Sequence, residues 1–342
     1  MSKTVALPLA LMLAGCSGSG TTGTADTAVD GCAVKMTSEG LAGALYSVFG
    51  TSPSDVYVVG ADAGTGPELH HYNGSDWTPI DCGHSGDIWW GWHSGGDEVV
   101  FVGAGGAILS YAPSSGACTD QSVDVVDGTV LFGVWGSSAD DIWAVGGNPT
   151  TGSGGVVFRR EAGTWTAVAD LPAQAGPGQI FKVWGSGADD VWFVGANALL
   201  LQWNGTEWIV HPPPIANTTT LFTVSGHAGE VYAVGGFGSG VVARYDGTTW
   251  TDDSPGPEAR AAGFNGVTAS DQGILAVGNS GSFFTRGDGW TAACEVPITF
   301  QDYHGSFIDA DGGFWAVGGT LSQQTDGIIA YSGPNPPASI SQ

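Results

Sequence analysis

Acidic residues are the commonest chemistry-bearing side chains in this chain, which has 33 Asp and Glu but only 8 Lys and Arg. One acid recurs at the same turn in each of seven similar segments. Carboxylates near backbone carbonyls can bind calcium, but no run alternates acids at calcium-loop spacing with a closing Glu. Asp in a turn commonly hydrogen-bonds the backbone two residues on. We therefore interpret these acids as turn formers, with calcium binding as the alternative. They are Asp55, Glu98, Asp141, Asp190, Glu230, Asp271 and Asp311.

Other catalytic patterns are weak. The stretch Val102–Ile108 is glycine-rich like a phosphate-binding loop, yet neither a helical pattern nor the required Lys follows it. No Gly-x-Ser-x-Gly, Cys-x-x-Cys or zinc-type Cys/His spacing occurs. Glycosidases need two facing carboxylates, but in a chain with so many acids this requirement does not distinguish a glycosidase from a non-catalytic protein. We predict no catalytic residue, metal or cofactor.

The dipeptide Val-Gly closes an apolar strand seven times in the sequence. These seven positions predict the strands that must position any site. A period of about 40–45 residues with one such glycine per unit is typical of radial β-sheet repetition. Few charges and many glycines also favour short strands and tight turns over helices. The glycines are Gly60, Gly103, Gly146, Gly195, Gly235, Gly278 and Gly318.

Each unit reads as four antiparallel strands. The third strand often ends in an aromatic residue, and a turn such as Asn73-Gly74 or Asp246-Gly247 leads to a fourth strand marked by Trp. Asn-Gly and Asp-Gly are strong hairpin turns because both central residues need positive φ. Seven such units predict an all-β fold, a seven-bladed β-propeller.

The two ends of the chain predict how the ring closes. The seventh unit stops after its third strand, Ile328–Tyr331, and we expect Cys32–Met36 to supply the missing fourth strand. Joining the ends removes exposed strand edges. The expected organisation is a signal peptide over 1–15, a lipidated Cys16 and tether over 16–31, the propeller over 32–333 and a tail over 334–342.

Four cysteines fall on or just after the expected outer strands. An even number in an exported chain favours disulfides. The register places Cys82 beside Cys118 and Cys32 beside Cys294, in neighbouring blades. The other pairing would leave Cys118 and Cys294 in blades that do not touch, so we predict Cys82–Cys118 and Cys32–Cys294.

The N-terminus has the features of an export signal. Lys3 precedes a short apolar run, Val5–Leu13, and Leu-Ala-Gly-Cys16 is similar to a bacterial lipobox. The run is too short to span a bilayer. The resemblance implies cleavage before Cys16 and its acylation with palmitate, with a plain signal peptide as the alternative. We expect a lipid-anchored envelope protein, on the outer membrane or cell surface.

The net charge of −25 limits the partners. Nucleic acids and anionic lipid surfaces are bound by clustered Lys and Arg, which this chain lacks. We expect no nucleic-acid partner, contact with a membrane only through the lipid, and a monomer.

The motif Val-Trp-Gly-Ser-x-x-Asp-Asp-Ile/Val-Trp-x-Val-Gly, found at 134–146 and 183–195 in slightly varied form, resembles repeats of bacterial surface lipoproteins of the propeller class. It is more distantly similar to photosystem II assembly-factor propellers and to Asp-box propellers of sialidase type. The resemblance covers Leu45 to Tyr331 and implies fold more than function. The Asp-box is only partly kept at Asp246–Trp250, and a sialidase-type arginine cluster is not evident.

Departures from the repeat carry the most information about function. In the column at the start of the inner strands, five blades place an aromatic residue, whereas Asn265 and His304 do not. In the next column, small residues predominate and Trp90 and Lys182 are the exceptions. Large or polar residues near the axis are where ligands usually meet a propeller. We predict a ligand site at Trp90, Lys182, Asn265 and His304, with channel filling by Trp90 as the alternative.

The favoured function is a non-catalytic, membrane-tethered scaffold that presents loops to a protein or glycan partner. The alternative is a secreted glycoside hydrolase or polysaccharide lyase. A convergent set of ionisable side chains at one mouth of the channel would distinguish the second class from the first.

Overall fold

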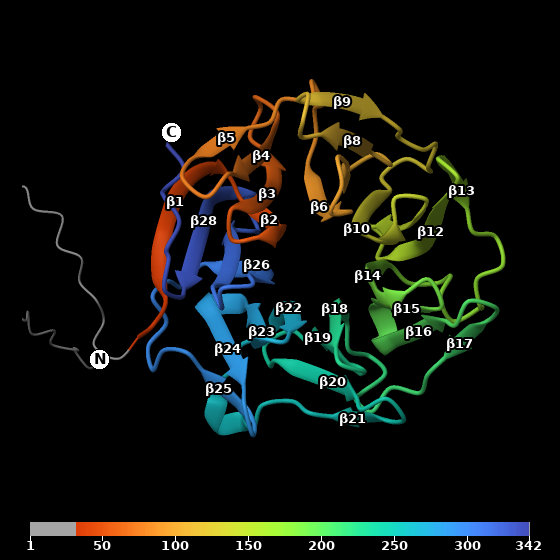
Figure 1. Cartoon of the computed structure of the whole chain (residues 1–342). Helices are drawn as coiled ribbons and strands as arrows, with labels where there is room; N and C mark the ends of the chain where they lie inside the picture. The colour runs from red at the N-terminus through yellow and green to blue at the C-terminus, as the bar shows by residue number, and fades with distance from the viewer. Residues whose placement is uncertain (1–31, 342) are drawn as a thin grey trace, which may run out of the picture.

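The computed structural model describes residues 32–341, which form a ring of seven four-stranded antiparallel sheets around a central channel (Figure 1). The predicted seven-bladed β-propeller is therefore confirmed. The signal peptide, Cys16 and the tether lie outside the described residues.

In every blade the strands run outward from the channel in chain order, except that the outer strand of the last blade comes from the N-terminal side. The inner strands are β2 (Leu45–Ser52), β6 (Ile88–His93), β10 (Val130–Ser138), β14 (Ile180–Gly187), β18 (Leu221–His227), β22 (Phe264–Ser270) and β26 (Asp302–Ile308). The second strands are β3 (Asp55–Asp62), β7 (Val99–Gly103), β11 (Asp141–Asn148), β15 (Asp190–Gly195), β19 (Glu230–Gly235), β23 (Gly273–Gly278) and β27 (Phe314–Thr320).

The two remaining strands of each blade complete the sheets. The third strands are β4 (Pro67–Tyr72), β8 (Ile108–Ala112), β12 (Ser153–Glu161), β16 (Leu199–Trp203), β20 (Val241–Tyr245), β24 (Ser282–Arg286) and β28 (Thr325–Ser332). The outer strands are β5 (Trp77–Pro79), β9 (Ala117–Asp120), β13 (Thr164–Ala167), β17 (Trp208–Val210), β21 (Trp250–Asp252), β25 (Trp290–Ala292) and β1 (Lys35–Gly43). Single-turn 3-10 helices, η1 (Ala196–Ala198), η2 (Pro257–Ala259) and η3 (Asn279–Gly281), lie in the connections.

The hydrophobic core lies between the blades rather than at the centre of the ring. The second strands are apolar on both faces, as strands covered on both sides must be, and every residue of β7 is buried. Most clusters join two neighbouring blades: Trp143 of β11, for example, packs against Phe193 of β15 and Trp208 of β17. Each blade is therefore stabilised mainly by its two neighbours.

The Val-Gly glycines are required by a close approach of the backbone. At Gly146 a Cβ atom would lie 2.0 Å from the carbonyl oxygen of Val130, at the start of the inner strand, and at Gly195 it would lie 2.2 Å from that of Gln179. The other five repeat the contact at 1.9–2.2 Å with Ala44, Asp87, Thr220, Gly263 and Asp302. No side chain fits in that space, so a glycine is required at or near the end of each second strand.

The ring closes at the predicted place but with different strand bounds. β1 pairs antiparallel with β28, from Lys35 opposite Tyr331 to Gly43 opposite Thr325. The expected strand Cys32–Met36 is wrong in extent, because residues 32–34 precede the sheet and Val34 is buried in the core between the sixth and seventh blades.

The residues after β28 lie against the same seam. The indole N–H of Trp77 donates to the carbonyl of Ala338 at 2.8 Å, and the N–H of Ile340 donates to Ser38 Oγ at 3.0 Å. Ile340 is buried in the core shared by the first and seventh blades. The C-terminal residues thus cover β1, the strand that closes the ring.

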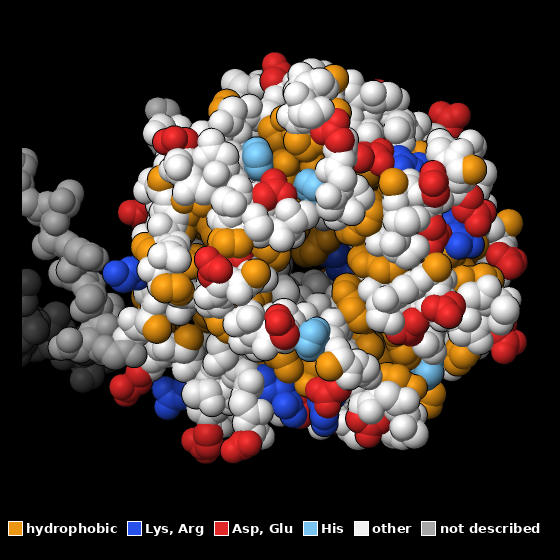
Figure 2. All heavy atoms as spheres, viewed as in Figure 1, with side chains coloured by type: hydrophobic (Ala, Val, Ile, Leu, Met, Phe, Trp, Pro, Cys, Tyr) orange, Lys and Arg blue, Asp and Glu red, His pale blue; other side chains and the backbone are white. Residues whose placement is uncertain are grey.

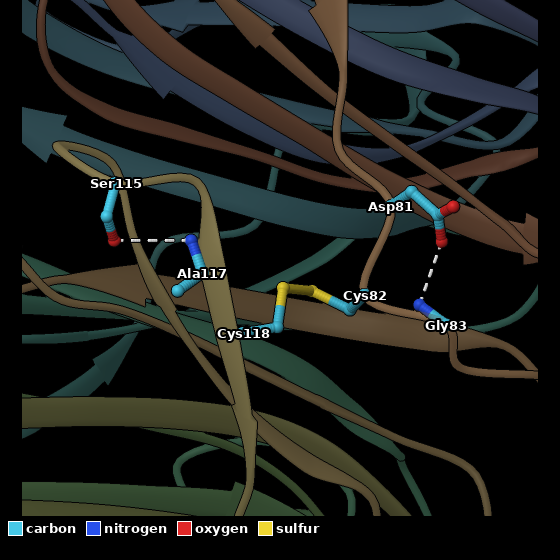
Figure 3. Close-up of a disulfide and its surroundings, with 6 residues drawn as sticks. All are labelled: Asp81, Cys82, Gly83, Ser115, Ala117 and Cys118. Atoms are coloured by element: carbon cyan, nitrogen blue, oxygen red, sulfur yellow. Dashed lines mark hydrogen bonds between the residues drawn. A yellow bond between two sulfur atoms is a disulfide. The ribbon is translucent and has the colours of Figure 1, made fainter.

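Two disulfides join neighbouring blades, in the pairing expected from the sequence. Cys32 is bonded to Cys294 beside the closing strand, and Cys82 is bonded to Cys118 between the first two blades. Figure 3 shows the second bond between two tight turns, in which Asp81 accepts from the N–H of Gly83 and Ser115 accepts from that of Ala117.

Removing Cys32–Cys294 by double substitution to Ser should lower the free energy of unfolding by about 2–5 kcal/mol, measured by urea denaturation. The matched control is the double Ser variant of Cys82 and Cys118. Because the bonded residues are separated by 262 positions in the first case and 36 in the second, chain entropy makes the first loss larger by about 2 kcal/mol. Equal losses, or a Cys32–Cys82 peptide in a non-reducing digest, would contradict this closure.

Candidate binding site at the central channel

A β-bulge near the start of every inner strand positions the channel-lining residues. In the first blade Leu45 pairs with Gly60 and Ser47 pairs with Val59, so Tyr46 is an extra residue without a partner. A bulge places two residues opposite one and re-aims their side chains. The same shift occurs in all seven blades. The bulge residues, here called the collar, are Tyr46, Trp89, Phe132, Phe181, Phe222, Asn265 and His304.

The collar forms a nearly continuous ring of aromatic contacts. Tyr46 stacks on Trp89 with ring centroids 4.3 Å apart, and Trp89 meets Phe132 edge-on at 5.3 Å. Phe132–Phe181 and Phe181–Phe222 continue the series at 5.2 and 5.3 Å, and His304 contacts Tyr46 at 5.5 Å. Asn265 alone interrupts the ring. Such a collar offers aromatic edges and faces to an apolar ligand.

The residues that follow the bulges form a second layer, here called the channel layer. In it the Lys182 side chain, which is 4% exposed as a residue, lies with its Nζ 4.1 Å from the centre of the Trp90 ring. Nζ also donates to the carbonyl oxygen of Phe132 at 2.8 Å. Burial lowers the pKa of Lys182 to about 7. The layer consists of Ser47, Trp90, Gly133, Lys182, Thr223, Gly266 and Gly305.

His304 stands next to this pair. Its ring centroid is 6.5 Å from that of Trp90, and its Nδ1 donates to the carbonyl oxygen of Tyr46 at 2.6 Å. Burial, together with the charge of Lys182, lowers the pKa of His304 to about 3, so the imidazole is neutral at physiological pH. Trp90, Lys182 and His304, which lie far apart in the sequence, therefore meet in the channel.

Asn265, the fourth predicted residue, has a different environment. Its amide N–H₂ donates to Asn279 Oδ1 at 2.9 Å and to the carbonyl of Tyr303 at 2.8 Å, joining the sixth and seventh blades. Its hydrogen bonds link two blades and do not involve Lys182 or Trp90. We place it at the edge of the site.

The bulges explain part of this polarity. A bulge leaves backbone groups unpaired, and the carbonyls of bulge residues Tyr46, Phe132 and Asn265 accept from His304, Lys182 and the hydroxyl of Thr223. These bonds satisfy His304 Nδ1 and Thr223, but they use only one of the three N–H donors of Lys182.

The recurring turn acids are structural in the blades where they pair. Asp141 accepts from Arg159 Nε at 2.8 Å, Asp55 bonds to His71 at 2.8 Å and Asp190 accepts from Gln202 at 2.8 Å, in each case on the third strand. In the sixth and seventh blades the position is Gly273 and Gly313, so Asp271 and Asp311 lie earlier in their turns. Within residues 32–341, no three His, Cys, Asp or Glu side chains are grouped as metal ligands would be.

One face of the ring is marked by exposed apolar side chains. Because the strands of a blade alternate in direction, all the inner strands begin on the same side of the ring. The second-to-third and blade-to-blade connections lie on that side too, and it is here called the loop face. The large hydrophobic residues exposed among the described residues all lie in these connections or at the end of a strand leading to them. They are Val126, Val210, Phe237, Val296 and Phe300, and Phe237 and Phe300 are each 78% exposed.

Phe237 connects the collar to this face, because its ring meets that of Phe222 edge-on at 5.2 Å. Figure 2 shows the ring hollowed at its centre, with hydrophobic side chains and a Lys or Arg side chain on the wall of the hollow. Lys182 is the only Lys or Arg on the seven inner strands, all of which are described. A separate pocket of about 680 Å³ lies between the sixth and seventh blades, lined by Arg260, Phe283 and Phe300 among others.

No protein-family model and no curated protein sequence matches the chain. Solved structures do. YCF48 from Cyanidioschyzon merolae has a TM-score of 0.64 at 13% identity, over 88% of this chain and 98% of that one. YCF48 bound to a D1 peptide has 0.65 at 15%, over 90% and 99%. The extracellular domain of BT4673 from B. thetaiotaomicron has 0.62 at 13%, over 85% of this chain and 38% of that one, so the chain spans well under half its length. At these identities the likeness establishes the propeller fold.

Sequence reasoning identified the channel residues by their departure from the repeat but not their contacts. The exposed apolar residues of the loop face were missed, although Phe237 and Phe300 stand in segments between expected strands. A large apolar residue in an otherwise polar connection was the available signal.

Replacing Lys182 by Met should raise the free energy of unfolding at pH 7 by about 1–2 kcal/mol, measured by denaturant unfolding. Each unit of pKa shift corresponds to about 1.4 kcal/mol, and the lost bond to Phe132 offsets part of the gain. Because folding lowers the pKa of Lys182, the free energy of unfolding of the wild-type protein falls as the pH falls from about 10.5 to about 7. The extra stability of the Met variant should therefore shrink towards pH 10. A variant less stable than the wild type at both pH values would identify Lys182 as a purely structural donor.

Proposed function

We propose that this protein is a non-catalytic binding scaffold of the cell envelope, which engages a protein partner through its loop face. The observation that carries the proposal is that all the exposed large hydrophobic residues of the described part of the chain lie on that one face. Soluble monomeric proteins expose few such side chains together, and contiguous apolar surface marks interaction sites. Aromatic anchors of this kind supply much of the affinity in protein interfaces.

The loop face is built as a rigid platform, which favours binding. The second-to-third strand connections bond to the blade-to-blade connections beside them: Gly105 N–H donates to Thr129, Ala198 N–H to Thr219 and Gly281 N–H to Gln301, at 2.6–2.9 Å. Loops fixed in this way lose little conformational entropy when a partner binds.

The channel favours binding over hydrolysis. Within the collar and the channel layer there is no Asp or Glu, so this site does not offer the two carboxylates that glycoside hydrolysis or a comparable acid–base reaction requires. The glycosidase alternative would need a site elsewhere on the ring. Of the structural neighbours, YCF48 has been solved with a D1 peptide bound, which shows that a propeller of this shape can hold a peptide.

Attachment to a membrane is part of the proposal and rests on the sequence. Two disulfides between blades suit an oxidising compartment outside the cytoplasm, and the neighbour BT4673 contributes an extracellular domain. Among residues 32–341, no helix has the length and apolar character needed to cross a membrane. Lipid on Cys16 would then hold the protein at the membrane, with 17–31 as tether.

Replacing both Phe237 and Phe300 by Asp should weaken capture of the partner from native membranes about tenfold or more, because two apolar anchors are lost. The matched control is Thr248→Asp, an exposed residue in the turn between β20 and β21 on the opposite face of the fifth blade. Bound proteins are quantified from crosslinked pull-downs at equal protein concentration. Equal capture by all three proteins, or capture of glycan alone, would contradict a protein partner on the loop face.

Labelled palmitate should enter the wild-type protein in the native host and not a Cys16→Ser variant. The variant should also leave the membrane fraction, since a cleaved chain without acyl groups has no other proposed anchor. Equal membrane partition of both proteins would show that the lipobox interpretation is wrong. Cys82→Ser with Cys118→Ser serves as the control for loss of cysteine elsewhere.

A further inference from the structure

The described cations on or near the third strands all have a carboxylate of their own, whereas Lys182 has none. The Arg–carboxylate pairs are Arg159–Asp141, Arg160–Glu98, Arg244–Glu230 and Arg286–Asp253. The chain has 33 acids, yet the buried Lys182 ammonium contacts only one carbonyl oxygen and the face of an indole ring. A buried cation normally has a counter-ion, so the missing partner calls for an explanation.

The surroundings of Lys182 keep its ammonium within the channel. At Gly133, on the neighbouring blade, a Cβ atom would lie 3.2 Å from Lys182 Cδ, so the lysine crosses a position where the blade presents no side chain. It thereby reaches Trp90, two blades away. In the same layer the hydroxyl of Ser47 is buried without a hydrogen-bond partner among the described residues. Unused donors therefore occur in the channel layer on both Ser47 and Lys182.

We propose that the collar and channel layer form a binding site for a carboxylate carried on an apolar or aromatic body, with Lys182 as the counter-ion of the carboxylate and the collar around the body. This goes beyond the proposed function, because it assigns a ligand chemistry to the channel that does not depend on the loop-face partner.

A carboxylate is favoured over other anions by the number of charges available. Lys182 is a single point charge, and the only other ionisable groups in the collar and channel layer are the neutral His304 and the phenol of Tyr46. Phosphate and sulfate sites commonly use Arg clusters or several backbone donors, and the net charge of −25 opposes entry of a multiply charged anion. A singly charged carboxylate matches one ammonium.

An apolar body is favoured by the collar. Five of its seven members are aromatic and in mutual contact, and Phe237 extends the series onto the loop face. A ligand that enters from the loop face passes these rings before its charged end reaches Lys182, which would bury its apolar part. The lowered pKa of Lys182 agrees with this arrangement, since a bound anion stabilises the charged ammonium.

Two sources could supply such a ligand: a free aryl or alkyl carboxylic acid, or the C-terminal carboxylate of a chain ending in an apolar residue. The two share the chemistry that Lys182 would recognise. They differ in whether a peptide backbone must lie across the collar, and the experiment has one arm for each.

The test uses the folded protein with ¹³Cε-labelled lysine. Lysine occurs only at positions 3, 35 and 182, so the signal of Lys182 can be assigned with one variant. Phenylacetate is titrated against its neutral counterpart phenylacetamide, and a short peptide ending in Phe with a free C-terminus against the same peptide amidated. Affinities are also measured by calorimetry for Lys182→Met and for the matched control Lys35→Met, which removes an exposed lysine on β1.

We expect a carboxylate to shift the Lys182 signal and its amide to leave it unchanged, with binding about tenfold or more weaker in Lys182→Met and unaltered in Lys35→Met. Binding of phenylacetate identifies a free acid as sufficient, and binding of the free-ended peptide alone identifies a chain end. If neither carboxylate binds more tightly than its amide, the proposal is overturned, and that comparison needs only the wild-type protein. The double Asp variant of Phe237 and Phe300 tests the proposed function separately. If it loses partner capture but still binds the carboxylate, the result bears on the loop-face partner and not on the channel site.

Discussion

The close contact between a glycine and a backbone carbonyl, made once in every blade, governs the arrangement of the rest of the ring. Near the end of the second strand, a carbonyl at the start of the inner strand occupies the space of a Cβ atom, as at Gly146 and Val130. The residue after that carbonyl pairs with the glycine, the next one is the bulge residue, and pairing resumes after it. The tight approach and the bulge therefore occur together, and the bulge turns consecutive residues towards the channel. The proposed binding site follows from this construction of the blades.

The repeat made the fold predictable from sequence. Seven Val-Gly steps, Asn-Gly and Asp-Gly turns and a Trp on five of the seven outer strands are local signals, and each has a single structural interpretation within a hairpin. Disulfide pairing followed because blade order fixes which outer strands are neighbours. The columns also identified Trp90, Lys182 and His304 as exceptions. Their meeting was not predictable, because the reach of Lys182 across Gly133 to a blade two positions away depends on side-chain direction at a bulge.

Two details show where local reasoning failed. The missing fourth strand of the seventh unit predicts a strand over Cys32–Met36, but Val34 is buried between blades and the pairing is made by the more polar Lys35–Gly43. An outer strand has one face in solvent, so polarity there is expected. In the last two blades an Asp in the turn was assigned to the column that Gly273 and Gly313 occupy. In both turns the Asp stands two residues before that position, and a glycine takes the place that an acid has in the other blades.

The pairing of β1 with β28 also has a consequence for the order in which the molecule is made. Within the described residues β1 is the first strand to leave the ribosome and β28 the last, so Lys35 waits for Tyr331 while almost the whole ring is synthesised. Six blades can form from contacts within short stretches of chain, whereas the seventh needs ends separated by nearly the full length, the slowest kind of contact to find. Until then the last blade lacks its outer strand, and β1 is an unpaired strand open to pairing with other chains. Ring closure thus requires the whole chain, because a chain cut short at any blade is left with an open end.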